Sequence, residues 1–252
     1  MRNSEDILTD PPPPAADARL AYGPEPLQFG DLRAPAGEGP FPLAIVIHGG
    51  YWKANYNLIH TGHLCRALTE DGVATWNVEY RSLGDPGGGW PGTGEDIARA
   101  VEFIPKLPVD HTRIVLVGHS AGGQLALWAA KKARLPVVAL APVSDVQESA
   151  ERNGPDSPPA KFMPPEHLAD GSPLELLPLG VRQIVIHCTD DDGVPYTMSE
   201  RYVSAAGEEA ELVRLEGGGH FELIDPLASA WPRVKAAIES LLEPPGSAAP
   251  PL

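Results

Sequence analysis

The sequence predicts a single α/β domain built on a mostly parallel, doubly wound sheet. Short apolar runs rich in β-branched residues alternate along the chain with helical patterns. The runs in the middle of the chain lack alternating polar positions, which is typical of strands covered on both faces. The length of 252 residues suits one large domain of this class. Such an alternation implies right-handed crossovers between parallel strands.

The expected elements follow one another in a regular order. We expect strands over 43–47, 73–80, 113–117, 137–141, 183–188 and 211–216. We expect helices near 58–70, 93–105, 120–134, 196–206 and 226–242. Together they define a domain over 19–242. The proline-rich segment 1–18 and the polar end 243–252 are expected to be a disordered and a flexible tail.

One segment, 144–180, interrupts the alternation and contains seven prolines. A long irregular excursion inside an α/β domain is often a functional lid or cap. We therefore expect a small cap or lid here.

Composition narrows the class of function. The net charge of −15 repels nucleic acid and anionic membranes, so neither is an expected partner. The two cysteines, Cys65 and Cys188, are too few for a disulfide-stapled scaffold and form no metal-ligand spacing. The N-terminus lacks a signal-peptide core, and no apolar run reaches the roughly 18 residues of a membrane span. We expect a cytoplasmic protein; the oligomeric state is left open.

The segment Gly118–Gly122 matches G-x-S-x-G, with Ser120 at its centre. The motif follows an expected strand and opens an expected helix, which is the context of a nucleophile elbow. The alternative is a glycine-rich turn in which Ser120 only caps the helix. The context favours Ser120 as a nucleophile.

A serine nucleophile needs a base, and His220 is the candidate. His220 follows three glycines directly after the last expected strand. This fold class places its catalytic histidine between the last strand and the final helix. The alternative is a histidine in a surface loop.

Three aspartates after the strand 183–188 are candidates to orient the histidine. Asp191 is favoured over Asp190 and Asp192, because the sequence reads D-x-x-V-P from Asp191. Asp145 and Asp225 are alternative candidates for the aspartate that orients the histidine. Asp225 precedes Pro226, so we interpret it as the N-cap of a proline-led helix.

The run His48–Trp52, HGGYW, follows the strand 43–47. In this fold class the first half of an oxyanion hole lies there, so the backbone N–H groups of Gly50, Tyr51 and Ala121 are the expected donors. A simple turn is the alternative. Trp52 is interpreted as core or pocket wall, with both open, and His119 as a pocket residue. His48 is expected to be structural.

These motifs resemble those of the α/β-hydrolase superfamily. The HGGYW run, GHSAGG at 118–123, the D-x-x-V-P loop and GGGHFELIDP at 217–226 are similar to the esterase/lipase branch that includes kynurenine formamidase. The segment 78–97 also resembles that branch. The resemblance covers about 22–242. It implies hydrolysis of an ester or aryl amide through an acyl-enzyme, without cofactor or metal.

The sequence therefore predicts a serine hydrolase that cleaves short-acyl carboxylic esters or aryl formamides, with a small-molecule ester or amide as its partner. Kynurenine formamidase activity is one alternative. A catalytically silent binding protein on the same fold is the alternative from another class.

Overall fold

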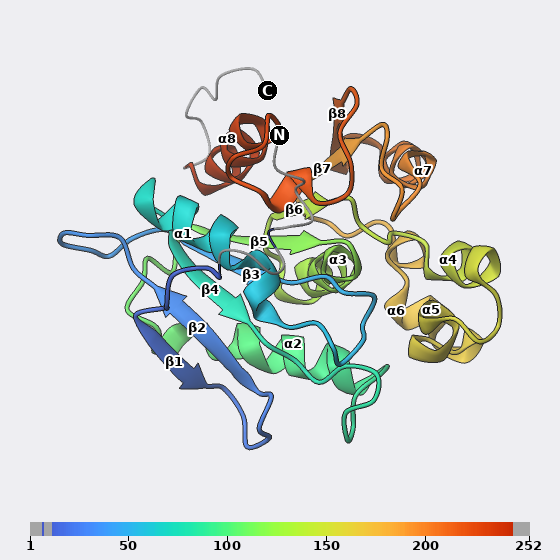
Figure 1. Ribbon diagram of the computed structural model, residues 1–252, viewed down its shortest axis with the longest axis horizontal. Helices are drawn as coiled ribbons and strands as arrows, with labels where there is room; N and C mark the ends of the chain where they lie inside the picture. The colour runs from blue at the N-terminus through green and yellow to red at the C-terminus, as the bar shows by residue number, and fades with distance from the viewer. Residues whose placement is uncertain (1–6, 8–11, 244–252) are drawn as a thin grey trace.

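The computed structural model describes residue 7 and residues 12–243 (Figure 1). Its centre is an eight-stranded sheet in the order β1-β2-β4-β3-β5-β6-β7-β8. The strands are β1 (Ala18–Ala21), β2 (Phe29–Arg33), β3 (Leu43–Ile47), β4 (Ala74–Val78), β5 (Ile114–His119), β6 (Val137–Leu140), β7 (Gln183–Cys188) and β8 (Ala210–Leu215).

The strands from β4 to β8 are parallel, whereas β2 pairs antiparallel with both β1 and β4. The six expected strands are present, and the predicted fold class is confirmed. The sequence analysis missed β1 and β2. Both are short, and FGDLR in β2 contains a glycine and two charged residues, which weakens the strand signal.

Helices cover both faces of the sheet. On one face lie α2 (Gly92–Glu102) and α3 (Ala121–Ala133), which join one buried cluster together with α7 (Tyr196–Ala206). On the other face α1 (Gly62–Glu70) and α8 (Trp231–Leu242) join a second cluster. Figure 1 shows α1 and α8 above the sheet and α2 below it. The central strands are thus buried on both sides, as their unbroken apolar runs predict.

The last helix begins later than expected, at Trp231 instead of residue 226. Asp225 is therefore not its N-cap, and that interpretation is wrong. Asp225 instead ends the short 3₁₀ helix Glu222–Ile224, and its side chain accepts a hydrogen bond from the N–H of Leu227 at 3.0 Å. The carboxylate thus shapes a turn before the helix.

The excursion between β6 and β7 consists of short helical pieces, namely α4 (Val146–Asn153), α5 (Pro158–Phe162) and α6 (Leu168–Gly171) with two 3₁₀ turns. Prolines stand at or near the first position of several of these pieces, where a missing N–H costs nothing. The excursion lies beside the carboxyl ends of the strands on the right of Figure 1. Its role as a cap stays a prediction.

The expected tails fall largely on residues 1–6, 8–11 and 244–252, which lie outside the described residues. Within the described part, Pro14 and Asp17 bind the edge of the sheet. The carbonyl of Pro14 accepts from Arg33 at 2.8 Å, and the carboxylate of Asp17 accepts from the N–H of Ala34 at 2.8 Å. In the part of the chain that the structure covers, no helix is long and apolar enough to cross a membrane.

Candidate active site

Ser120 lies in a strained turn between β5 and α3. Its backbone has φ 58° and ψ −121°, a conformation that costs a non-glycine residue about 1–3 kcal/mol. The turn is fixed from both sides: the N–H of Ser120 donates to the carbonyl of Leu140 in β6 at 2.9 Å, and its carbonyl accepts from Gly123 at 2.9 Å. Ser120 is thus held at the carboxyl edge of the sheet and at the start of a helix.

Glycines allow this turn to form. A Cβ on Gly118 would collide with the carbonyl of Gly122, and a Cβ on Gly122 would collide with the carbonyl of Ile47 in β3. Backbone atoms cannot move aside as a flexible side chain can. The spacing G-x-S-x-G therefore follows from the close approach of α3 to two strands, as a nucleophile elbow requires.

His220 and Asp191 are joined by a hydrogen bond. Nδ1 of His220 lies 2.8 Å from Oδ2 of Asp191. Asp190 instead accepts from the hydroxyl of Thr189 at 3.3 Å, and Asp192 is exposed. An imidazole that donates through Nδ1 presents a lone pair on Nε2, which is the tautomer a general base needs.

Asp191 is held as a charged group. Its side chain is fully buried, and Oδ1 accepts from the N–H groups of Gly193 and Val194 at 2.8 Å each. Burial acts to raise the pKa of this carboxyl, but hydrogen bonds from His187 and His220 and the charge of His220 outweigh it and hold the pKa well below its usual range.

The sequence analysis missed His187, which contacts the same carboxylate. Its Nε2 lies 3.0 Å from the carbonyl of Val194 and 3.2 Å from Oδ2 of Asp191, and its Nδ1 lies 2.7 Å from the hydroxyl of Ser199. Since Nε2 faces two acceptors, it carries a proton, and Nδ1 accepts from Ser199. The signal in the sequence was a histidine four positions before Asp191 at the end of a buried strand.

Gly193 was also missed. A Cβ at this position would lie 2.9 Å from Cγ of His220, a separation that real Cβ atoms do not adopt. The imidazole therefore lies directly on the backbone of the loop that carries Asp191.

Ser120 and His220 line the same cavity. Among the described residues, no hydrogen bond joins the hydroxyl of Ser120 to Nε2 of His220. Such bonds are often long in unliganded enzymes and tighten when substrate binds.

The loop after β3 adopts an unusual backbone conformation beside Ser120. Gly50, Tyr51 and Trp52 have φ of 118°, 57° and 56°, so three successive residues are in the left-handed half of φ space. The N–H of Lys53 closes the turn on the carbonyl of Gly50 at 3.0 Å. Left-handed non-glycine residues often mark functional loops, because the surrounding structure has to impose them.

A buried network under this loop fixes its start. His48 Nε2 lies 3.0 Å from Glu79 and the His48 ring stacks on Tyr80 with centroids 4.3 Å apart. Burial acts to raise the pKa of Glu79, but the charge and hydrogen bond of His48 and the N–H groups of Leu58 and Tyr80 outweigh it and lower that pKa. His48 is thus structural, as expected.

Trp52 lies in the core and does not line the cavity of Ser120. It is 1% exposed, donates through Nε1 to Gln124 at 3.0 Å and stacks on Phe162 at 4.5 Å. The pocket-wall interpretation is therefore wrong for Trp52. The indole N–H finds a partner only in the core, and the excursion supplies a parallel ring to cover its face.

The cavity at Ser120 has a volume of about 300 Å³. His119, expected as a pocket residue, lines it, and so do Gly50 and Tyr51, whose role as oxyanion donors stays a prediction. Ala121, the third expected donor, is fully buried and does not line it. The sequence analysis did not identify the other lining residues: Lys53, Tyr56, His60, Asp192, Gly193 and Phe221. Four of the lining side chains are imidazole or phenyl rings within 6.0 Å of one another.

Two histidines in the wall are uncharged at neutral pH. Burial, with the nearby charges of His48 and His220, lowers the pKa of His60 to about 3. Burial and the charges of His220 and His60 also hold the pKa of His119 well below its usual range. Nε2 of His119 lies 2.9 Å from the carbonyl of His220, so this ring also positions the backbone of the candidate base.

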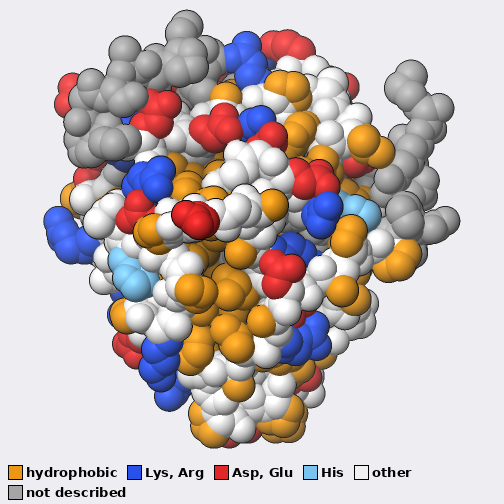
Figure 2. All heavy atoms as spheres, turned by 90° about the vertical axis from the view of Figure 1, so that its left-hand side faces the viewer, with side chains coloured by type: hydrophobic (Ala, Val, Ile, Leu, Met, Phe, Trp, Pro, Cys, Tyr) orange, Lys and Arg blue, Asp and Glu red, His pale blue; other side chains and the backbone are white. Residues whose placement is uncertain are grey.

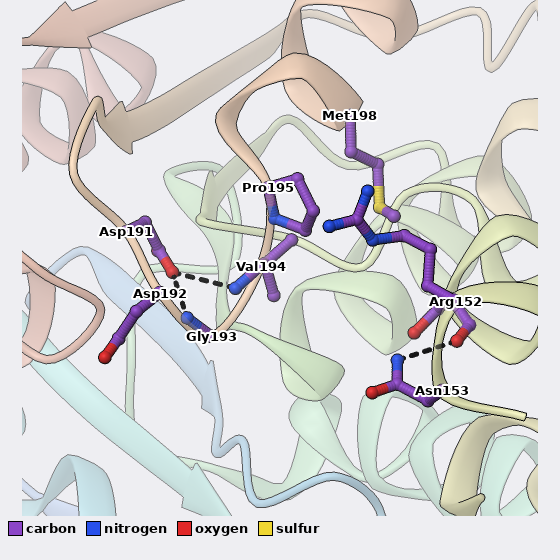
Figure 3. Close-up of a pocket in the computed structure, with 9 residues that line it drawn as sticks. Arg152, Asn153, Asp191, Asp192, Gly193, Val194, Pro195 and Met198 are labelled. Carbon is purple, nitrogen blue, oxygen red and sulfur yellow. Dashed lines mark hydrogen bonds between the residues drawn. The ribbon is translucent and has the colours of Figure 1, made fainter.

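A second cavity, of about 510 Å³, lies on the other side of the loop after β7. Figure 3 shows Arg152 from α4 extending toward Pro195 and Met198, opposite Asp192. Asp192 and Gly193 line both cavities. The loop that holds Asp191 thus separates them.

Among residue 7 and residues 12–243, no group of three or more histidine, cysteine or acidic side chains is arranged to hold a metal ion. Ser120, His220 and Asp191 supply a hydroxyl, an imidazole and a carboxylate, the three kinds of group that nucleophilic catalysis by serine uses.

Comparison with protein families gives two overlapping matches. The prolyl oligopeptidase family matches over residues 92–225, which include Ser120, Asp191 and His220. The BD-FAE family matches over residues 31–147, which include the HGGYW run and Ser120. The two matches together span the sheet from β2 to β8.

Several solved structures are similar over nearly their whole length. One is a truncated carbohydrate esterase from gut microbiota, at 19% identity and a TM-score of 0.74, covering 92% of this chain and 98% of that one. Esterase B from Lactobacillus rhamnosis is similar at 19% identity and a TM-score of 0.76, covering 94% of this chain and 90% of that one. An acetyl ester-xyloside bifunctional hydrolase from Caldicellulosiruptor lactoaceticus is similar at 20% identity and a TM-score of 0.70, covering 90% of this chain and 97% of that one. At these identities the likeness confirms the α/β-hydrolase fold.

Proposed function

The chain belongs to the prolyl oligopeptidase family, and we propose that it is a serine hydrolase that cleaves short-acyl carboxylic esters or aryl formamides through an acyl-enzyme. The observation that carries this proposal is the hydrogen bond of 2.8 Å between the buried carboxylate of Asp191 and the imidazole of His220, which lines the same cavity as Ser120. The structural neighbours named as esterases support ester bonds as the substrate class.

In the proposed reaction, the hydroxyl oxygen of Ser120 attacks the acyl carbon while Nε2 of His220 takes its proton. Asp191 stabilises the imidazolium that forms, and the low pKa of its carboxyl keeps that charge in place. His220 then returns the proton to the leaving alcohol or amine. Water attacks the acyl-enzyme by the same route and releases the acid and Ser120.

The tetrahedral intermediate carries a negative oxygen that needs donors already in position. Ala121 is the first residue of α3, so its N–H has no partner within the helix. The left-handed turn at Gly50 and Tyr51 supplies the second donor in this proposal. Loss of one such donor typically costs 10²–10³-fold in kcat.

The small cavity supports short acyl groups. Its volume of about 300 Å³ has to hold both halves of the substrate, and Tyr51 and Tyr56 occupy part of its wall. An open apolar tunnel would instead add about 0.8 kcal/mol for each buried methylene. We expect kcat/KM for p-nitrophenyl esters to peak at or below butyrate and to fall by octanoate. A maximum at octanoate or longer would contradict the short-acyl part of the proposal.

Aryl formamides, with N-formylkynurenine as the kynurenine formamidase substrate, are the narrower alternative. The ring-lined wall of His60, Phe221 and Tyr56 favours a planar group beside the scissile bond. Rates on N-formylkynurenine and on p-nitrophenyl acetate, measured side by side, decide between the two substrate classes.

A catalytically silent binding protein is the alternative from another class of function. Substitution of Ser120 distinguishes this alternative from a serine hydrolase. Ser120→Ala should lower kcat on the order of 10⁶-fold while the circular dichroism spectrum and thermal stability stay unchanged. The wild type should label with a fluorophosphonate and the variant should not. Hydrolysis by the variant within tenfold of wild type would refute Ser120 as the nucleophile.

A further inference from the structure

A cavity of about 770 Å³ lies at the edge of the sheet opposite to Ser120. It is lined by residues that directly precede β5, β6 and β7 and by the end of α8. Because these strands are parallel, their amino ends lie one strand length from the candidate active site, which is about 20 Å for the six residues of β5. This cavity is therefore separate from the site described above.

The lining is basic, although the protein as a whole has 34 acidic residues and 19 Lys and Arg residues. Arg113, Arg134 and Arg182 all contribute to it. Arg113 is paired with Asp110 at 2.6 Å. Neither of the other two arginines has an ion-pair partner among the residues that the structure describes.

The acidic residues near this edge do not neutralise those two arginines. Glu209 accepts hydrogen bonds from the N–H groups of Leu179 and Gly180, at 2.8 and 2.9 Å, and it neither lines the cavity nor forms an ion pair with Arg134 or Arg182. Glu243, at the end of α8, is the acidic residue in the lining. Two guanidinium groups against one carboxylate leave a net positive charge in the cavity.

The rest of the lining is largely apolar. It consists of one proline and five aliphatic side chains from four segments of the chain: Ile114, Leu135, Pro136, Val181, Leu241 and Leu242. Figure 2 shows the molecule from the left of Figure 1, the side from which the parallel strands start. Apolar side chains gather at the centre of this face, and both basic and acidic side chains lie around them.

We propose that this cavity binds a small amphipathic anion, a carboxylate or phosphate head on an apolar body. The planar guanidinium fork matches the two oxygens of a carboxylate or phosphate, and charge-assisted hydrogen bonds of this kind are among the strong ones. The apolar body then lies on the aliphatic lining. A net charge of −15 repels anions at long range, so binding depends on the local arginines. The proposal is independent of any reaction at Ser120.

The test uses isothermal titration of the whole protein with decanoate, decyl phosphate and decanol, which share one apolar body. We expect wild type to bind at least one of the two anions about tenfold more tightly than decanol, and more weakly as salt is added. Arg134→Gln/Arg182→Gln should lose that preference. Comparison of decanoate with decyl phosphate identifies the preferred head group.

Arg66→Gln is the matched control, because Arg66 is paired with Glu70 on the exposed face of α1. It should bind all three ligands as wild type does. If wild type binds decanol as tightly as both anions, this result alone shows that the proposal is wrong. If the double variant keeps the anion preference, the anion binds elsewhere, for example at Ser120, and the proposal is equally overturned.

Discussion

Asp191 differs from its two neighbours in what its oxygens contact. One oxygen accepts from two backbone N–H groups and the other contacts the rings of His187 and His220. Asp190 and Asp192 make no such contacts with either ring. The three carboxylates are identical in chemistry, so only their direction distinguishes them.

We expect Asp191→Asn to lower kcat about 10⁴-fold, because an amide no longer holds the His220 tautomer or stabilises the imidazolium. Asp190→Asn and Asp192→Asn serve as matched controls and should stay within tenfold of wild type. Turnover of p-nitrophenyl acetate by the three variants measures the difference. A larger loss in either control would assign the orienting role to that residue.

The sequence context was enough to place candidate site residues at the edge of the sheet, but it could not show in which direction their side chains point. Ser120 and His220 were selected because they follow particular strands, and a parallel sheet brings the ends of its strands to one edge. Whether a side chain leaves that edge toward the cavity or toward the core depends on backbone torsion angles. Trp52, with φ 56°, leaves toward the core, and no pattern in HGGYW indicates this.

The helix α3 lies very close to the sheet. Gly118, Gly122 and Gly123 face the backbone or side chains of neighbouring segments with no room for a Cβ. The helix dipole and the N–H of Ala121 are thereby brought to the end of β5 and beside β3. Packing of one helix thus determines both the core and the site.

We expect Gly122→Ala to destabilise the protein by more than about 3 kcal/mol and to abolish activity, because α3 has to move away from the carbonyls of Ile47 and His48. Gly154→Ala is the control: Gly154 has φ 89° and ψ 169° and no atom within 4 Å of an added Cβ, so only the backbone strain of this glycine-favoured region, about 1–3 kcal/mol, is added. Urea denaturation and esterase assays of both variants measure the contrast. Equal losses of stability and activity in the two variants would show that the close approach of α3 to β3 is not the reason for a glycine at position 122.

Long and strongly patterned elements were predicted well, and short edge elements were not. The five central parallel strands are mainly apolar because helices cover both faces, although β4 also contains Thr75 and Asn77. β1 is the edge strand, where ARLA alternates between exposed and half-buried positions. β2 lies next to it and is mostly buried, but FGDLR carries a glycine and two charged residues. The start of α8 was misplaced because Pro226 and Pro232 both suit the first turn of a helix, and only tertiary contacts select the second.

At the scale of the whole molecule, buried uncharged histidines make stability depend on pH. The pKa of His60 is about 3 in the folded protein, against about 6.5 in an unfolded chain. Above pH 6.5 both states are neutral and the group has no effect. Below that pH the unfolded chain binds a proton that the folded protein does not, so the free energy of unfolding falls.

We expect His60→Phe to lose about 2 kcal/mol less stability than wild type between pH 7 and pH 5. Phenylalanine keeps the ring contacts with Tyr56 and Phe221 but binds no proton. This window lies above the range in which most carboxylates titrate. Urea denaturation at both pH values measures the difference, with half-buried His167→Gln as a control that should keep the wild-type dependence. Parallel pH profiles for wild type and His60→Phe would contradict the burial argument.

The parallel sheet also bears on how this protein can change over evolution. Ser120 follows β5 and Asp191 follows β7, with β6 between these two strands, so two strand spacings, about 10 Å in all, separate the strands that carry the two residues. The segment 144–180 joins β6 to β7 but contributes nothing to that spacing. A lineage can therefore lengthen, shorten or rewrite this segment, and with it the entrance that a substrate meets, while Ser120 and Asp191 stay in register.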